Sequence, residues 1–192
     1  MNENEFQMIK STIEHKVNKT VIGIRKLYQA TIDGEESSKF HSKCDGIKNT
    51  ITLIKSARNR RFGGFTSESW DTSRKYKDDN TCFLFSLDKQ KIYQIKENCK
   101  AIACYNGYGP VFGGDDYNDI QLGDTPISKN QLYTYESHKN CHFNYFGDNN
   151  ALSEDGKCSY IKAIDYEIFE ILFWYIFIIK DKNRGIENIK YQ

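Results

Sequence analysis

From residue 50 onward, the chain consists of short apolar runs separated by turn residues. These runs are ITLIK (51–55), RFGGF (61–65), CFLFSL (82–87), KIYQI (91–95), AIACY (101–105), DIQLGD (119–124) and IKAIDYEIFEIL (161–172). Runs of this length favour strands over helices, and aromatic residues, 14% of the chain, suit half-buried pleated surfaces. The pattern therefore predicts a mainly β (α+β) fold: a two-sheet antiparallel β-sandwich with short flanking helices and an N-terminal helix.

The N-terminal segment has a different periodicity. Apolar side chains recur in steps of three and four residues at Phe6, Ile9, Ile13, Val17, Val21, Ile24 and Tyr28. This spacing draws one stripe along a helix, so an amphipathic helix is predicted over residues 3–29, packing on an element of this chain or of a partner. A second, short helix is predicted around Phe40 and Cys44, with Ser37 or Ser38 as its N-cap.

The C-terminal part combines a polar stretch with an apolar one. Residues 123–159 are irregular and polar, so they are predicted to form an exposed excursion. The run IFEILFWYIFII (168–179) is shorter than the ~20 apolar residues of a membrane-spanning helix, and its β-branched and aromatic content favours one buried strand that completes the sheet. The division that follows is a helix over 1–26, a domain over 27–172, and an apolar then polar tail over 173–192.

Charge and cysteine content narrow the function classes. The chain has 27 Lys and Arg against 26 Asp and Glu, so no global field attracts nucleic acid or anionic lipid. The first ten residues, MNENEFQMIK, contain no apolar stretch of the kind a signal peptide needs. A cytoplasmic protein with six reduced cysteines is therefore expected, with no nucleic-acid partner and no transmembrane span.

No arrangement of chemical groups predicts a catalytic, cofactor or metal site. The acidic group Asp115, Asp116, Asp119 and Asp124 lacks the spacing of a calcium loop and is interpreted as a solvated loop. The set His138, Cys141, His142 and Cys158 fits no common zinc spacing. The glycine-rich loop at 107–114 lacks a phosphate-binding fingerprint, and the chain has no G-x-S-x-G nucleophile motif.

Several motifs nevertheless occur together in a fixed order. They are LYQATIDGEESSKFHSKCDG (27–46), ITLIKS (51–56), FGGFTSESWD (62–71), CFLFSL (82–87), YGPVFGGDDYNDIQL (108–122) and IDYEIFEI (164–171). Together they resemble the TLDc domain family, which is found in oxidation-resistance proteins. The residues that carry the resemblance are Gly63, Gly64, Trp70, Tyr108, Gly109, Pro110, Phe112, Gly113, Gly114, Asp119, Glu167 and Phe169. For these we expect structural roles: glycines in turns or close approaches, and aromatic rings in packing.

The chain departs from the family pattern in three places. Asp115 stands where a third glycine is usual, the excursion 123–159 shares little with the family, and the tail runs beyond the usual end of the domain. A partner surface built from these segments would differ from that of other members.

The resemblance implies a function as well as a fold. It implies a β-sandwich without a catalytic centre or cofactor, protection against oxidative stress, and binding to subunits of the vacuolar proton-pumping ATPase with control of its assembly. It also implies a location in the cytoplasm and at the surface of acidic organelles. Two alternatives stay open: a thiol-based redox enzyme or peroxide scavenger using residues such as Cys99 and Cys104, and an adaptor that pairs with another chain through its N-terminal helix.

Overall fold

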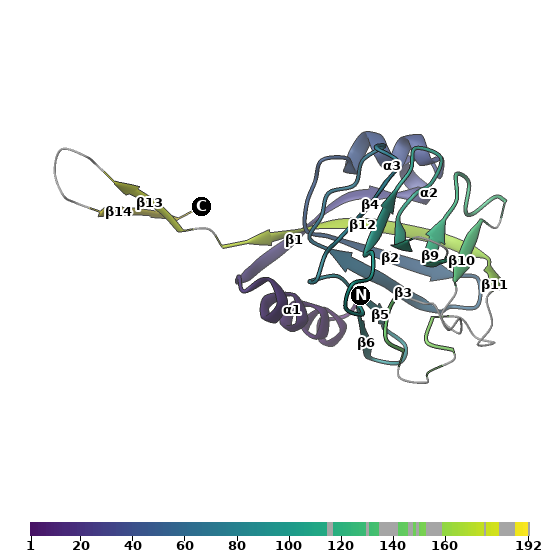
Figure 1. The fold of residues 1–192 in the computed structure, drawn as a ribbon, viewed down its shortest axis with the longest axis horizontal. Coiled ribbons are helices and arrows are strands. Elements are labelled where there is room, and N and C mark those ends of the chain that lie inside the picture. The colour runs from purple at the N-terminus through teal and green to yellow at the C-terminus, as the bar shows by residue number, and fades with distance from the viewer. Residues whose placement is uncertain are drawn as a thin grey trace.

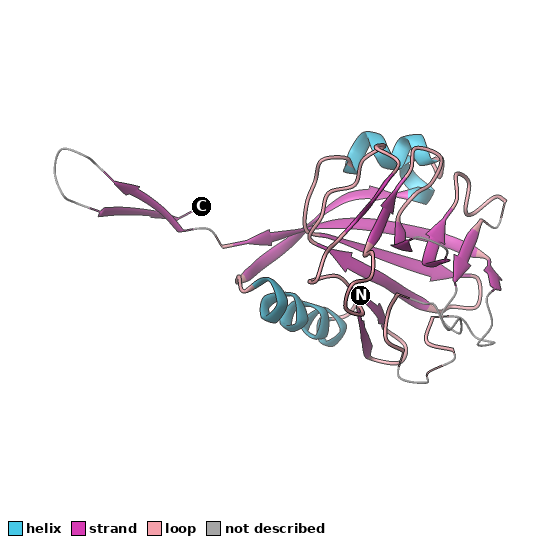
Figure 2. Ribbon diagram, viewed as in Figure 1, coloured by secondary structure: helices cyan, strands magenta, loops and turns pink. Residues whose placement is uncertain are grey.

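The structure is a computed structural model that describes residues 1–114, 117–129, 131–134, 142–145, 148, 150–152, 159–174, 176–180 and 187–191. Two six-stranded antiparallel sheets pack face to face, with helices around them (Figures 1 and 2). This architecture confirms the predicted mainly β sandwich with an N-terminal helix. The runs at 51–55, 61–65, 82–87, 91–95, 101–105 and 119–124 all contain strands of the two sheets.

The first sheet brings the two ends of the domain together, because its first and last strands, β1 and β12, pair with each other. Its strands, in spatial order, are β1 (Val21–Gln29), β12 (Ala163–Phe173), β2 (Thr50–Ser56), β3 (Arg61–Thr66), β5 (Phe83–Ser86) and β6 (Lys91–Gln94). The runs at 82–87 and 91–95 form the β5–β6 hairpin. Because β12 lies between β1 and β2, the last strand of the domain is a central one and buries both of its edges.

The second sheet carries most of the glycine-rich motif. Its strands, in spatial order, are β11 (Ser159–Ile161), β10 (Leu132–Thr134), β9 (Tyr117–Leu122), β8 (Val111–Gly114), β7 (Ile102–Cys104) and β4 (Lys75–Lys77). The glycine-rich loop predicted at 107–114 thus contains a strand, because residues 111–114 pair with β9. The apolar residues between the sheets form one core, in which Trp70 contacts both Phe40 and Phe112 edge-to-face.

The N-terminal helix is shorter than its apolar periodicity predicts. Helix α1 covers Glu3–Val17 and ends at Asn18, whose φ of 53° is left-handed, a conformation that asparagine tolerates. The helix predicted over 3–29, and the division at 1–26, are therefore wrong beyond Val17, because residues 21–29 form β1. Pairing with β12 and the β-branched residues of this segment favour the strand, and Gly23 disfavours the helix.

Two short helices, α2 (Ala30–Asp33) and α3 (Ser37–Cys44), lie between β1 and β2. Helix α3 confirms the short helix predicted around Phe40 and Cys44. Its N-cap residue, however, is Glu36, which makes no side-chain cap hydrogen bond. The Ser37 hydroxyl instead donates to the second sheet's loops, at Asn106 O (2.9 Å) and Asp124 Oδ1 (2.6 Å).

Parts of the 123–159 segment are buried, which contradicts the expected exposed excursion. Strand β10 belongs to the second sheet, and Phe143, Tyr145, Ala151 and Leu152 lie in the core. Residues 142–145 run beside β6, where the backbone amide of Asn144 donates to Gln94 O at 2.8 Å. The segment reads as polar in sequence because its few apolar residues do not alternate, although each of these four is buried.

The apolar run at 168–179 is divided and does not form one strand. Its first part ends β12 at Phe173, and Trp174 is 44% exposed. Its last part lies in β13 (Ile176–Lys180), which pairs with β14 (Glu187–Tyr191) as a separate hairpin beyond the end of β12 (Figure 1). Within the described residues, no helix has the length and apolar character needed to cross a membrane.

Candidate functional site

Most of the motif residues meet across the sandwich. Gly63 and Gly64 lie on β3 of the first sheet, whereas Phe112, Gly113 and Gly114 lie on β8 and Asp119 on β9 of the second. Trp70 packs on Phe112, and Gly109, in the loop that also holds Tyr108 and Pro110, lies close to Leu122 and Tyr166. Glu167 and Phe169 are separate from this group: on β12 they lie beside Lys26, which binds the Glu167 carboxylate and sits 5.5 Å from the Phe169 ring centre.

The two F-G-G sequences contact each other through the core. A Cβ at Gly64 would lie 2.6 Å from the ring of Phe112, and a Cβ at Gly63 would lie 1.8 Å from the carbonyl oxygen of Thr52. Neither residue has a positive φ. These glycines are therefore required by close approach, one of the two reasons expected from the sequence.

Gly113 is required for both reasons. Its φ is +94°, and a Cβ there would lie 2.8 Å from the backbone nitrogen and from Oδ2 of Asp119. Gly114 is limited by packing, because a Cβ would lie 2.8 Å from the ring of Tyr76. The pair thus allows β8 to bend at a bulge while β9 stays close enough to place Asp119.

Asp119 is fully buried and holds the 142–145 segment. Its carboxylate accepts hydrogen bonds from the backbone amides of His142 (2.8 Å) and Phe143 (3.3 Å) and from the Tyr145 hydroxyl (3.0 Å). The Nδ1 atom of His142 lies 3.0 Å from the same carboxylate. The interpretation of Asp119 as part of a solvated acidic loop is therefore wrong: it joins β9 to the segment that closes the sandwich beside β6.

The other proposed metal ligands do not converge in the described part of the chain. The Asp124 carboxylate accepts from both the amide and the hydroxyl of Ser37. No group of three His, Cys, Asp or Glu residues that could hold a metal ion occurs among the described residues. The remaining candidates, Asp115, Asp116, His138, Cys141 and Cys158, lie outside those residues.

His41 fixes the loop that contains Tyr108. Its Nδ1 lies 2.7 Å from Asp45 Oδ1, and its Nε2 lies 3.0 Å and 3.1 Å from the carbonyl oxygens of Tyr105 and Tyr108. The ring therefore ties α3 to the loop between β7 and β8. Sequence reasoning did not single out His41 as a site residue, although it and Asp45 stand in the FHSKCD portion of the first motif.

A second carboxylate, Asp148, forms a cluster of polar contacts three residues beyond the 142–145 segment. Burial alone raises the pKa of Asp148, but hydrogen bonds from Lys89, Lys91 and Tyr93 outweigh this effect and lower the pKa to about 2. The Tyr93 hydroxyl donates at 2.9 Å and the Lys91 ammonium lies at 3.0 Å. Like Asp119, this carboxylate acts as a structural anchor for its loop.

Three of the four cysteine thiols in the described residues have limited reactivity. Burial raises the pKa of Cys44 to about 12 and that of Cys104 to about 11, and it raises the pKa of Cys82 well above its usual value. Because the thiolate is the reactive form, these three cysteines are poor nucleophiles at neutral pH. Cys99 is half-buried, and the four described cysteines are free thiols.

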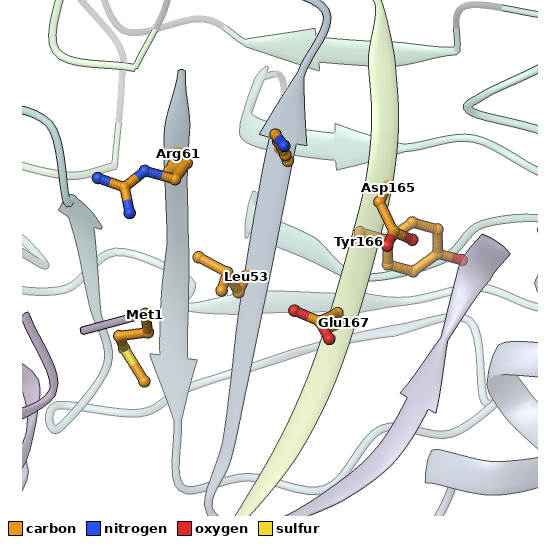
Figure 3. Close-up of a pocket in the computed structure, with 7 residues that line it drawn as sticks. Met1, Leu53, Arg61, Asp165, Tyr166 and Glu167 are labelled. Carbon is orange, nitrogen blue, oxygen red and sulfur yellow. The ribbon is translucent and has the colours of Figure 1, made fainter. Parts of the chain in front are cut away.

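A shallow pocket of about 220 Å³ lies on the other side of the first sheet, near the start of α1 (Figure 3). Three of its charged lining residues bond to protein partners: Arg61 to Glu5 and Asp88, Asp165 to Gln29, and Glu167 to Lys26. Its volume is below the ~300 Å³ at which small-molecule pockets usually begin. We therefore assign it no ligand.

Comparison with known proteins agrees with this geometry. A TLDc domain family model matches residues 1–172, and so includes α1 and β1, which the motifs alone left outside. The chain is 33% identical over 63 residues to "MTOR-associated protein MEAK7" of Danio rerio, a match that covers 33% of this chain and 14% of the relative. The Mus musculus protein of that name is 26% identical over 85 residues, covering 44% of this chain and 19% of the relative. The chain thus matches less than a fifth of the length of these relatives, and over most of its own length it belongs to the TLDc domain family.

Proposed function

We propose that this TLDc domain acts by binding a protein partner and has no enzymatic turnover of its own. The proposal rests on one observation: the polar side chains Asp119 and His41 of the motifs make their hydrogen bonds within the domain. The Asp119 carboxylate accepts three hydrogen bonds within the domain, and both ring nitrogens of His41 lie near oxygen acceptors. Groups held in this way serve packing and loop placement better than they serve proton transfer to a substrate.

The family resemblance supplies the partner for this proposal. It points to subunits of the vacuolar proton-pumping ATPase, whose assembly the domain would regulate, and to protection against oxidative stress. The domain would then act in the cytoplasm, at the surface of acidic organelles. The name of the relatives, "MTOR-associated protein MEAK7", adds MTOR as a second partner to test.

The two alternatives have weaker structural support. A thiol enzyme would depend chiefly on Cys99, because the other described thiols are buried. An adaptor that pairs through its N-terminal helix would first have to release α1, since Ile9 and Ile13 are buried against the first sheet. That release would expose the apolar residues under the helix to water, at a cost of about 25 cal/mol per Å².

The test measures capture and catalysis on the same preparation. Immobilised domain is incubated with purified cytoplasmic subunits of the proton pump and, separately, with MTOR, and peroxide consumption by the soluble domain is followed. We expect capture of pump subunits and no catalytic loss of peroxide. Turnover of peroxide that disappears in Cys99→Ser, with no pump subunit bound, would replace this proposal by the enzyme alternative.

A further inference from the structure

Three tyrosines, one on β4 and two in the loop between β7 and β8, form a connected aromatic patch at the edge of the second sheet. The rings of Tyr76 and Tyr105 meet edge-to-face at 6.1 Å between centres, and those of Tyr105 and Tyr108 meet at 5.9 Å. Tyr108 is 37% exposed, and the other two are half-buried. We call these three residues the tyrosine patch.

The position of the patch follows from strand register. Tyr76 on β4 pairs with Ala103, whereas the neighbouring residues Ile102 and Cys104 belong to the core between the sheets. Alternation therefore places Tyr76 on the outer face. The helices pack chiefly on β1 and β12 of the first sheet, and α3 reaches the patch at His41, which contacts the backbone of Tyr105 and Tyr108.

The charge beside the patch is positive. Arg74 and Lys75 directly precede Tyr76, are exposed, and form no ion pair with any described residue. Two acids near these cations in the described part of the chain are paired: Asp71 lies 2.7 Å from the Lys77 ammonium, and Asp78 lies 2.9 Å from that of Lys100. Arg74 and Lys75 therefore supply exposed positive charge next to Tyr76.

The patch is also held in place before any partner arrives. His41 Nε2 lies within 3.1 Å of the carbonyl oxygens of Tyr105 and Tyr108, and the Ser37 hydroxyl donates to Asn106 O. The amide of Gly109 donates to Leu122 O at 2.9 Å. A loop fixed at three points loses little conformational entropy on binding, which favours its use as a recognition surface.

We propose that the tyrosine patch, with Arg74 and Lys75, binds an acidic segment of a protein partner. Tyrosine rings supply a large contact area with few rotatable bonds, and the two cations attract carboxylates and orient the segment. A protein fits better than nucleic acid, because two cations neutralise few phosphates and the tyrosine rings already pack on one another. The inference rests on the proposal that the domain acts by binding, but it does not depend on which partner is bound.

The first experiment measures binding of a defined probe. A fluorescein-labelled twelve-residue peptide of glutamate, leucine and proline is titrated with the domain and followed by anisotropy. Its matched control carries glutamine in place of each glutamate. A single-stranded oligonucleotide and phosphatidylserine vesicles are tested in parallel. We expect saturable binding of the acidic peptide that weakens with salt, and at least about tenfold weaker binding of the glutamine peptide.

Variants then locate the site. We expect Arg74→Glu with Lys75→Glu, and separately Tyr105→Ala with Tyr108→Ala, to weaken the acidic peptide about tenfold or more. The control reverses two cations elsewhere, Lys10 on α1 and Lys55 on β2, and should leave binding within about twofold. Circular dichroism and thermal unfolding establish that each variant is folded.

Three outcomes would overturn the inference: no binding of the acidic peptide by the wild type, equal effects of the control and patch variants, or tighter binding of the oligonucleotide or vesicles. Its failure is distinguishable from failure of the proposed function. If patch variants still capture pump subunits like the wild type, the surface is wrong and the function stands. If the peptide binds at the patch while no pump subunit is captured, the surface stands and the partner is wrong.

Discussion

The outer faces of the two sheets differ in what covers them and in the residues they carry. The first sheet is covered by α1, and the residues between helix and strands are aliphatic or phenylalanine: Ile9, Ile13, Ile51, Leu53, Phe65, Phe83, Phe85, Ile171 and Phe173. The second sheet presents Tyr76 beside two tyrosines of the loop after β7. Because tyrosine has an apolar body and a polar tip, it suits a surface that is wet in one state and covered in another. The comparison shows that α1 covers the first face within the chain, whereas our proposal assigns a partner to the tyrosine patch.

The largest loss of stability is expected from a charge placed between α1 and the first sheet. Ile13→Asp would place a charge against apolar residues with no partner, so we expect loss of about 4 kcal/mol or more of unfolding free energy. Denaturant unfolding at neutral pH measures it. The matched change on the other face, Tyr108→Asp, should alter stability by less than about 0.5 kcal/mol. Equal losses at the two positions would remove the distinction between the faces.

A slightly smaller loss of stability is expected at Gly113, where β8 bends beside Asp119. Gly113→Ala combines a positive φ with a Cβ 2.8 Å from Asp119, so we expect a loss of about 3 kcal/mol, together with faster amide exchange at residues 142–145. Gly23→Ala is the control, because a Cβ at Gly23 meets nothing within 4 Å. A Gly113→Ala protein as stable as the control would show that the bulge and its contact with Asp119 are dispensable.

The anchor at Asp148 predicts a pH dependence. Its pKa is lowered from 3.8 to about 2, so its contribution is complete above the unfolded value and is lost as pH falls from about 4 to 2. The shift corresponds to at most about 2 kcal/mol. Asp148→Asn should therefore be less stable than the wild type at pH 7, and the difference should shrink towards pH 2. A difference that is constant over this range would mean that the ion pairs contribute nothing.

The smallest effect on stability should occur at the patch itself. Tyr108→Ser removes an exposed ring that packs on Tyr105, so we expect the free energy of unfolding to change by no more than about 0.5 kcal/mol. Partner binding should fall much more than stability does. A thermal unfolding curve and a capture assay on the same sample separate the two effects.

The sequence predicted the strands of the two sheets better than it predicted the end of the N-terminal helix. The alternating runs identified the strands of both sheets because their apolar residues face one core. The helix over 3–29 was overextended, because steps of three and four continue by coincidence through Val21, Ile24 and Tyr28 into a strand whose conformation is set by β12. Only the left-handed Asn18 marks the boundary, and asparagine alone is a weak stop signal.

At the candidate site, the glycines and Trp70 were identified through the family motif, but their partners were not. Asp119 resembled a solvated acid because its donors lie more than twenty residues further along the chain, in a segment without periodicity. The tyrosine patch joins β4 to the loop after β7, a contact that no local pattern encodes. Long-range pairing of polar groups is the information that a single sequence lacks.

The most direct test of the central claim is a hydrogen-exchange footprint of the domain bound to the cytoplasmic part of the proton pump. The account predicts added protection at residues 74–76 and 104–108, which contain the tyrosine patch, and unchanged exchange in α1 and the outer face of the first sheet. Protection that falls on α1 and β1, with none at the tyrosine patch, would contradict it.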